Sequence, residues 1–94
     1  MALYQINQSI YPAAVEQDWQ GSLQAGDAVL LIEAGVLRAS QHAPDLARLQ
    51  ERNIQIFLRE SDVLAYGISP TVGHLISDDE WVTQTTAHDT IISW

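Results

Sequence analysis

An unbroken apolar run, Ala28 to Ile32, constrains the fold more than any other feature of the sequence. A strand with one face in water alternates apolar and polar residues, whereas a continuous apolar run of this length indicates a strand covered on both faces. Such coverage is typical of a parallel sheet between two layers of helices. Gly26 and Asp27 precede the run and Gly35 follows it, which places a turn at each end.

The rest of the chain alternates short apolar segments with segments of helical character. This order predicts βαβ units and a three-layer α/β/α fold with a mainly parallel sheet of about five strands. The expected strands are residues 2–6, 28–32, 54–58, 74–76 and 90–92. The expected helices are one that Ser9 caps and Gly26 ends, then 44–52, 61–67, and one that Ser77 and Glu80 open as a capping box. Since 94 residues fold around one core, a single domain over residues 1–94 is expected.

Helical spacing predicts which side chains face the sheet. The first helix should direct Val15, Trp19 and Leu23 inward, and the last should direct Trp81, Val82 and Thr85 inward. Ile91 of the last strand is expected to join the core. With right-handed crossovers, helices should cover both faces, and the working surface should lie where the strands end, at residues 7–10, 33–36, 59–61 and 77.

Charge and hydropathy exclude several classes of protein. Twelve carboxylates face four arginines and no lysine, for a net charge of −8, which disfavours direct binding to nucleic acid phosphates. The longest apolar run is far shorter than the ~20 residues that span a bilayer. The N-terminal residues do not combine a positively charged start with an apolar block, so we expect no signal peptide. A soluble, cytoplasmic protein without membrane association is expected.

The absence of cysteine excludes disulfides, thiolate metal sites and a cysteine nucleophile. The three histidines, His42, His74 and His88, lie far apart in the sequence and lack the spacing of a metal site. We interpret them as unrelated surface or capping residues. Neither a metal nor another cofactor is expected.

Other candidate catalytic groups have simpler explanations. Asp78, Asp79 and Glu80 could do acid–base work or hold Mg²⁺, but acidic residues in a helix's first turn are favoured by its dipole. Ser69 lacks the second glycine of a nucleophile elbow. Gly35 could approach a phosphate, but one glycine is better explained as a turn. No catalytic residue is predicted.

Each of the three tryptophans has a predicted place. Trp19 and Trp81 are expected in the core because of their helical positions. Trp94 ends the sequence, where a large aromatic needs packing to be held in place. Docking on its own domain and docking on a partner protein both remain open.

Four stretches, in order and spacing, resemble the TusB/DsrH family over essentially the whole sequence. They are Leu3 to Ser9, Gly26 to Val36, Asp62 to Gly67, and an ending made of Trp81, Val82, Thr85, His88 and Trp94. The sequence departs from the family at four positions where a histidine, proline, aspartate and arginine are common, respectively Tyr4, Ile10, Ala34 and Tyr66.

The resemblance implies a DsrEFH-like fold and a place in a sulfur relay. Relatives assemble as B, C and D subunits in a two-fold heterohexamer, and a cysteine persulfide on the D-type subunit passes sulfur to a TusE-like or DsrC-like acceptor. One branch ends in 2-thiouridine at tRNA wobble positions, and another serves oxidation of stored sulfur. The expectation is the first branch, although the sequence does not itself distinguish the two.

Some DsrH members carry a cysteine near the position of Trp19, and this chain does not. The expectation is therefore a non-catalytic subunit that contacts TusC/DsrF-like and TusD/DsrE-like partners, with Trp94, Gly35, Val36 and Ser9 at the interface. A different class stays open: a stand-alone small-ligand or nucleotide-binding α/β domain that acts as a homo-oligomer. Copurification with two related subunits would favour the first class, and a ligand at the strand ends would favour the second.

Overall fold

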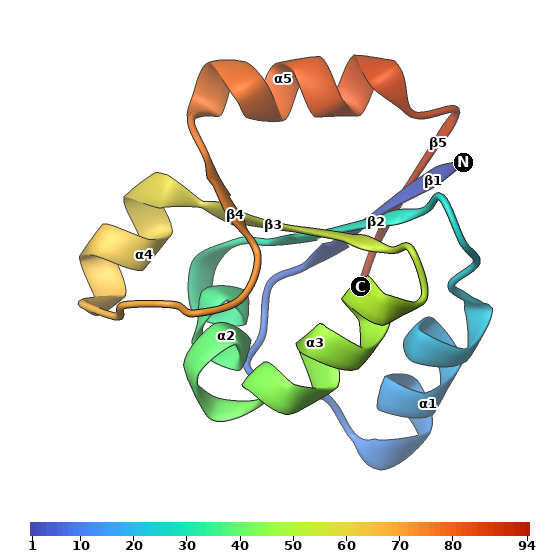
Figure 1. Ribbon diagram of the computed structural model, residues 1–94, viewed down its shortest axis with the longest axis horizontal. Coiled ribbons are helices and arrows are strands. Elements are labelled where there is room, and N and C mark those ends of the chain that lie inside the picture. Colours follow the sequence, from blue (N-terminus) through green and yellow to red (C-terminus); the bar gives the residue numbers. More distant parts are fainter.

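The computed structural model describes residues Met1–Trp94 as one twisted sheet with helices on both faces (Figure 1). The strands are β1 (Ala2–Ile6), β2 (Ala28–Leu31), β3 (Gln55–Arg59), β4 (His74–Ile76) and β5 (Thr90–Ser93). Every neighbouring pair is parallel, and the strand order is β4-β3-β2-β1-β5. The predicted α/β fold with a five-stranded parallel sheet is confirmed.

Helices join the strands in chain order. They are α1 (Ala13–Ser22), the 3₁₀-helix η1 (Glu33–Leu37), α2 (Arg38–Gln41), α3 (Ala43–Glu51), α4 (Glu60–Tyr66) and α5 (Asp78–Ala87). In Figure 1, α1, α2 and α3 lie below the sheet, and α5 runs alone above it between the two edge strands, β4 and β5. None of these helices combines the length and apolar character that a bilayer crossing needs.

Strand β2 lies at the centre, and all four of its residues are buried. Its alternate side chains enter two cores. The larger core, between the sheet and α1, α3 and α4, includes Val29 and Leu31; the smaller, on the α5 side, includes Ala28 and Leu30. Burying a Leu or Val side chain contributes about 1.5–3 kcal/mol, so this short strand contributes to both layers.

Helix α1 begins later than predicted, and Ser9 does not cap it. The helix starts at Ala13, after Pro12, without a capping side chain. The backbone N–H of Tyr11 instead donates to the Glu16 carboxylate at 2.8 Å. A side chain within the helix thus binds the backbone just before the helix begins. Trp19 is buried as predicted.

Helix α5 has the predicted capping box. The Glu80 N–H donates to the Ser77 hydroxyl, and the Glu80 carboxylate accepts from the Ser77 N–H. Its inner face is narrower than predicted: Trp81 and Thr85 are half-buried, but Val82 is 63% exposed. Residues four apart share a helix face, whereas the next residue is turned away by about 100°, so Val82 points aside.

The edge strand β5 gives a second correction. Ile91, expected in the core, is 43% exposed, because β5 pairs with β1 on one side only and lies at the margin of the layer that α5 covers. Its neighbour Ile92 is half-buried and packs against the larger core.

Candidate functional site

The carboxyl ends of the strands, where the sequence places the working surface, carry two networks centred on arginines. The first lies in the segments that follow β1 and β2 and is centred on Arg38 of α2. The second begins at the end of β3 and is centred on Arg59.

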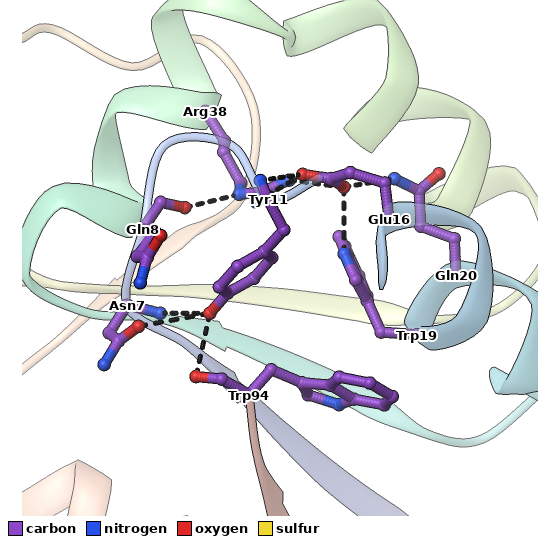
Figure 2. Close-up of polar contacts among 8 residues, drawn as sticks. All are labelled: Asn7, Gln8, Tyr11, Glu16, Trp19, Gln20, Arg38 and Trp94. Carbon is purple, nitrogen blue, oxygen red and sulfur yellow. Dashed lines mark hydrogen bonds and ion pairs between the residues drawn. The ribbon is translucent and has the colours of Figure 1, made fainter. Parts of the chain in front are cut away.

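Arg38 is buried, with 4% of its surface exposed. Its Nε donates to the Gln8 carbonyl at 2.8 Å, and its two terminal nitrogens donate to both oxygens of Glu16 at 3.0 and 2.7 Å (Figure 2). The guanidinium carbon also lies 5.2 Å from the ring centre of Tyr11 and 5.3 Å from that of Trp19. A bidentate, aromatic-packed guanidinium of this kind fixes the loop after β1 against α1 and α2.

The Glu16 carboxylate accepts several further hydrogen bonds. The Tyr11 N–H, the Trp19 indole Nε1 at 2.9 Å and the Gln20 amide at 3.0 Å all donate to it (Figure 2). Burial by itself raises the pKa of Glu16, but the hydrogen bonds and charge of Arg38, with those of Tyr11 and Trp19, outweigh it and lower the pKa to about 2. Glu16 is therefore ionised at neutral pH with its oxygens occupied, and it is not suited to proton transfer.

Tyr11 links this network to the last residue of the chain. Its hydroxyl donates to the Trp94 carbonyl at 2.9 Å and accepts from the Asn7 N–H at 3.3 Å (Figure 2). The Trp94 N–H donates to the Gln5 carbonyl at 3.1 Å, which continues the pairing of β5 with β1. The half-buried Trp94 ring packs against the larger core.

A cavity of about 210 Å³ opens beside Arg38, between α1 and α3. Its walls combine buried apolar side chains with polar ones from the network and from α3: Ile10, Glu16, Trp19, Gln20, Arg38, His42, Asp45, Leu46 and Leu49. Here the Arg38 network borders space for another molecule.

The four predicted interface residues separate into two groups. Val36 is fully buried in the larger core, and Gly35 is buried where an added Cβ would overlap the Ile6 carbonyl oxygen. These two residues serve the packing of the domain itself, and a partner cannot reach the Val36 side chain while that packing holds. Ser9 and Trp94 are half-buried, so contact with a partner stays a prediction for them.

Arg59 joins three elements on the other side. Its Nε donates to Asp78 of α5 at 2.9 Å, Asp62 of α4 lies 3.6 Å from its Nη1, and its guanidinium lies 4.9 Å from the ring centre of Trp81. The hydrogen bond to Asp78 raises the pKa of Arg59, and the same bond lowers the pKa of Asp78. Asp78 thus holds the start of α5 on the sheet, in line with a structural role for the acidic triplet.

The structure brings no three His, Cys, Asp or Glu side chains together as a metal site. His42 lines the cavity, the His74 ring packs edge-on against Phe57 at 6.3 Å, and His88 Nδ1 lies 2.8 Å from the Gln84 carbonyl. The three histidines therefore have different neighbours and do not form one site.

Sequence reasoning missed Arg38 and Glu16. The segment after β2 was read as a turn, so the short helices that carry Arg38 into the interior were not expected. Two signals pointed there: an arginine shortly after a fully buried strand, in a chain with only four basic residues, and a glutamate three residues before a core tryptophan on the same helix face.

A family model described as DsrH like protein matches residues 6–91. The chain belongs to the DsrH-like family. Membership implies a subunit of a sulfur-relay complex. Among solved structures, this DsrH-like chain is similar to the solution NMR structure of protein Tm0979 from Thermotoga maritima, with 26% identity, a TM-score of 0.66 and 95% of each chain covered. No curated protein matches it.

In this DsrH-like chain, Trp19 is 1% exposed. Its indole N–H donates to Glu16, and its ring packs beside Arg38. The Arg38 network therefore holds Trp19 in place by a hydrogen bond and by packing.

Proposed function

We propose that this chain is a non-catalytic subunit of a TusBCD/DsrEFH-type sulfur-relay complex in the cytoplasm. It supports persulfide transfer from a D-type subunit to a TusE/DsrC-like acceptor, in the branch that leads to 2-thiouridine at the tRNA wobble position. The observation that carries this proposal is the DsrH-like match over residues 6–91 in a sequence without cysteine. A thiolate is the group that attacks a persulfide, and this chain offers none.

The geometry at the strand ends supports a structural role. Arg38 donates to both oxygens of Glu16, and the remaining acceptor capacity of Glu16 is taken by neighbouring N–H groups. Such a network holds the loop after β1 in one conformation. With a net charge of −8, the chain is also suited to act without touching tRNA.

Exposed apolar side chains supply surfaces for two different partners. Leu64 and Tyr66 on α4 are 74% and 46% exposed, and Val82 on α5 and Ile91 on β5 are exposed on other parts of the surface. The outer edge of β5 pairs with no strand in this chain. A C-type subunit and a D-type subunit would each cover one of these surfaces. We expect the 94-residue sequence to fold as a single domain.

A reconstituted relay tests the proposal. The D-type subunit is loaded with persulfide, and transfer to the acceptor is followed by intact mass with and without this chain. We expect omission to slow transfer, while this chain's own mass stays unchanged. Stable addition of sulfur to this chain contradicts the non-catalytic role, and transfer that is indifferent to its omission contradicts the supporting role.

The branch is tested separately. In cells that lack their own B-type subunit, this chain should restore tRNA 2-thiouridine, measured by mass spectrometry of digested tRNA. An Arg38→Ala variant, in which the Arg38 network is disrupted, serves as the control and should restore less 2-thiouridine. Restored sulfur oxidation without restored thiolation would assign the chain to the other branch.

A further inference from the structure

The cavity between α1 and α3 has no part in the proposed relay function. At about 210 Å³ it is smaller than sites for drug-sized ligands, which start near roughly 300 Å³. It fits a compact molecule of one ring. Its inner wall is apolar, because Trp19, Leu46 and Leu49 are all buried.

Arg38 lines this cavity with hydrogen-bonding capacity to spare. A guanidinium carries five N–H donors. One bonds to the Gln8 carbonyl and two bond to Glu16, so one N–H on each terminal nitrogen has no acceptor from the protein. Arg38 is 4% exposed and lines the cavity, so an acceptor oxygen bound there would replace water on a free N–H of Arg38.

Charge decides which kind of acceptor fits. Glu16 already neutralises Arg38, and the Asp45 carboxylate at the cavity wall is paired with Arg48 at 2.6 Å. A carboxylate or phosphate would meet these carboxylates in a chain of net charge −8. A cation would be attracted by the carboxylates, but it would leave the Arg38 donors without an acceptor. A neutral carbonyl-type oxygen satisfies the donors without adding charge.

We propose that this cavity binds a small, neutral, planar molecule with a carbonyl-type oxygen. Its ring lies against Trp19 and the two buried leucines of α3, and its oxygen accepts from one free N–H of Arg38. This binding requires no partner subunit, so it is independent of assembly into a relay complex.

Four compounds that each carry one six-membered aromatic ring test the proposal on the unmodified full chain. They are benzamide, benzoate, benzamidine and toluene, and the readout is the NMR signal of the Trp19 indole N–H during titration. A neutral hydrogen bond contributes about 1 kcal/mol, so benzamide should bind at least about fivefold more tightly than toluene. Benzoate and benzamidine should also bind more weakly than benzamide. Absence of saturable binding by benzamide, or equal or tighter binding by any of the other three, overturns the proposal.

A pair of double variants locates the effect. Arg38→Met with Glu16→Gln removes the donors and the ion pair together, and benzamide should then bind no better than toluene. Arg59→Met with Asp78→Asn removes an ion pair on the other face of the sheet and should leave the preference for benzamide intact. If the first variant keeps that preference, the Arg38 assignment is wrong. The ligand series on the unmodified chain decides the proposal even where this variant does not fold.

Discussion

The Trp94 ring stacks on the Tyr4 ring of the neighbouring strand β1, with ring centres 6.4 Å apart and planes inclined by 28°. Of the two arrangements that the sequence left open, contact with the chain's own domain is therefore present. Trp94 Nε1 is nevertheless buried without an acceptor. An unpaired buried donor of this kind costs about 1–3 kcal/mol of stability.

Trp94→Ala should affect both stability and assembly. Loss of the contact with Tyr4 should lower the free energy of unfolding by about 1–2 kcal/mol, less than for a fully buried aromatic. Loss of an interface aromatic should weaken binding to partner subunits by roughly 1–3 kcal/mol. Chemical denaturation of the isolated chain and affinity for the partners measure the two effects separately.

Trp94→Phe is the matched control, because it keeps a ring against Tyr4 and removes the unpaired N–H. It should leave unfolding nearly unchanged. If Trp94→Ala lowers stability while affinity in folded samples is unchanged, Trp94 serves the domain alone and the interface proposal is wrong.

The Glu16–Arg38 pair predicts acid sensitivity. The pKa of Glu16 is about 2 in the folded chain, against an ordinary value of 4.5. Because the folded pKa is the lower one, this stabilisation is complete above pH 4.5 and is lost as the pH falls toward 2. Denaturation at a series of pH values should show a loss of about 2 kcal/mol from this group.

Glu16→Gln should flatten that acid dependence and lower stability at pH 7 by about 3–5 kcal/mol, because it leaves Arg38 buried without its counter-charge. Glu51→Gln, at the exposed end of α3, is the control and should keep the dependence of the unmodified chain. An unchanged acid dependence in Glu16→Gln would show that other carboxylates cause it.

Gly35→Ala should be strongly destabilising although it adds one methyl group. The added Cβ would overlap the Ile6 backbone carbonyl, which cannot move without shifting β1. We expect a loss of about 2–4 kcal/mol in denaturant unfolding. Gly21→Ala on α1 is the control, since nothing lies within 4 Å of its added Cβ, and it should be neutral or stabilising. Equal behaviour of the two variants would contradict the close approach of η1 to β1.

Arg59→Met should loosen α5 without unfolding the sheet. Helix α5 has no fully buried residue, and Arg59 connects its first turn to α4 and packs on Trp81. Hydrogen exchange should become faster in α5 and stay unchanged in β2 and β3, because weakly packed elements open locally. Arg48→Met, which removes an exposed pair on α3, is the control and should not alter exchange in α5. Unchanged α5 exchange in Arg59→Met would remove Arg59 from this role.

Local patterns predicted the fold well. The unbroken apolar run became a central strand buried on both faces, and the Ser77–Glu80 spacing became a capping box. Gly67 ends α4 in the left-handed conformation, as a glycine after a helix often does. These signals depend on neighbours in the sequence, so they can be read from it.

The site could be predicted less well, because it depends on contacts between distant segments. Arg38 is bonded to Glu16, 22 positions away, and no local pattern specifies that pair. Ser9 has a residue type that is common at helix caps, but α1 begins four residues later and the Tyr11 N–H before it donates to Glu16. Val82 and Ile91 are more exposed than predicted. A single helix over a sheet and a strand at its edge bury fewer apolar side chains than their hydropathy predicts.

The central claim is that this chain acts as a subunit among related partners. Co-expression with one C-type and one D-type subunit, followed by native mass spectrometry, tests it most directly. We predict a complex that contains all three chains in equal numbers, with a mass that corresponds to two copies of each. A chain that stays monomeric, or that forms only homo-oligomers beside both partners at micromolar concentration, would contradict the account.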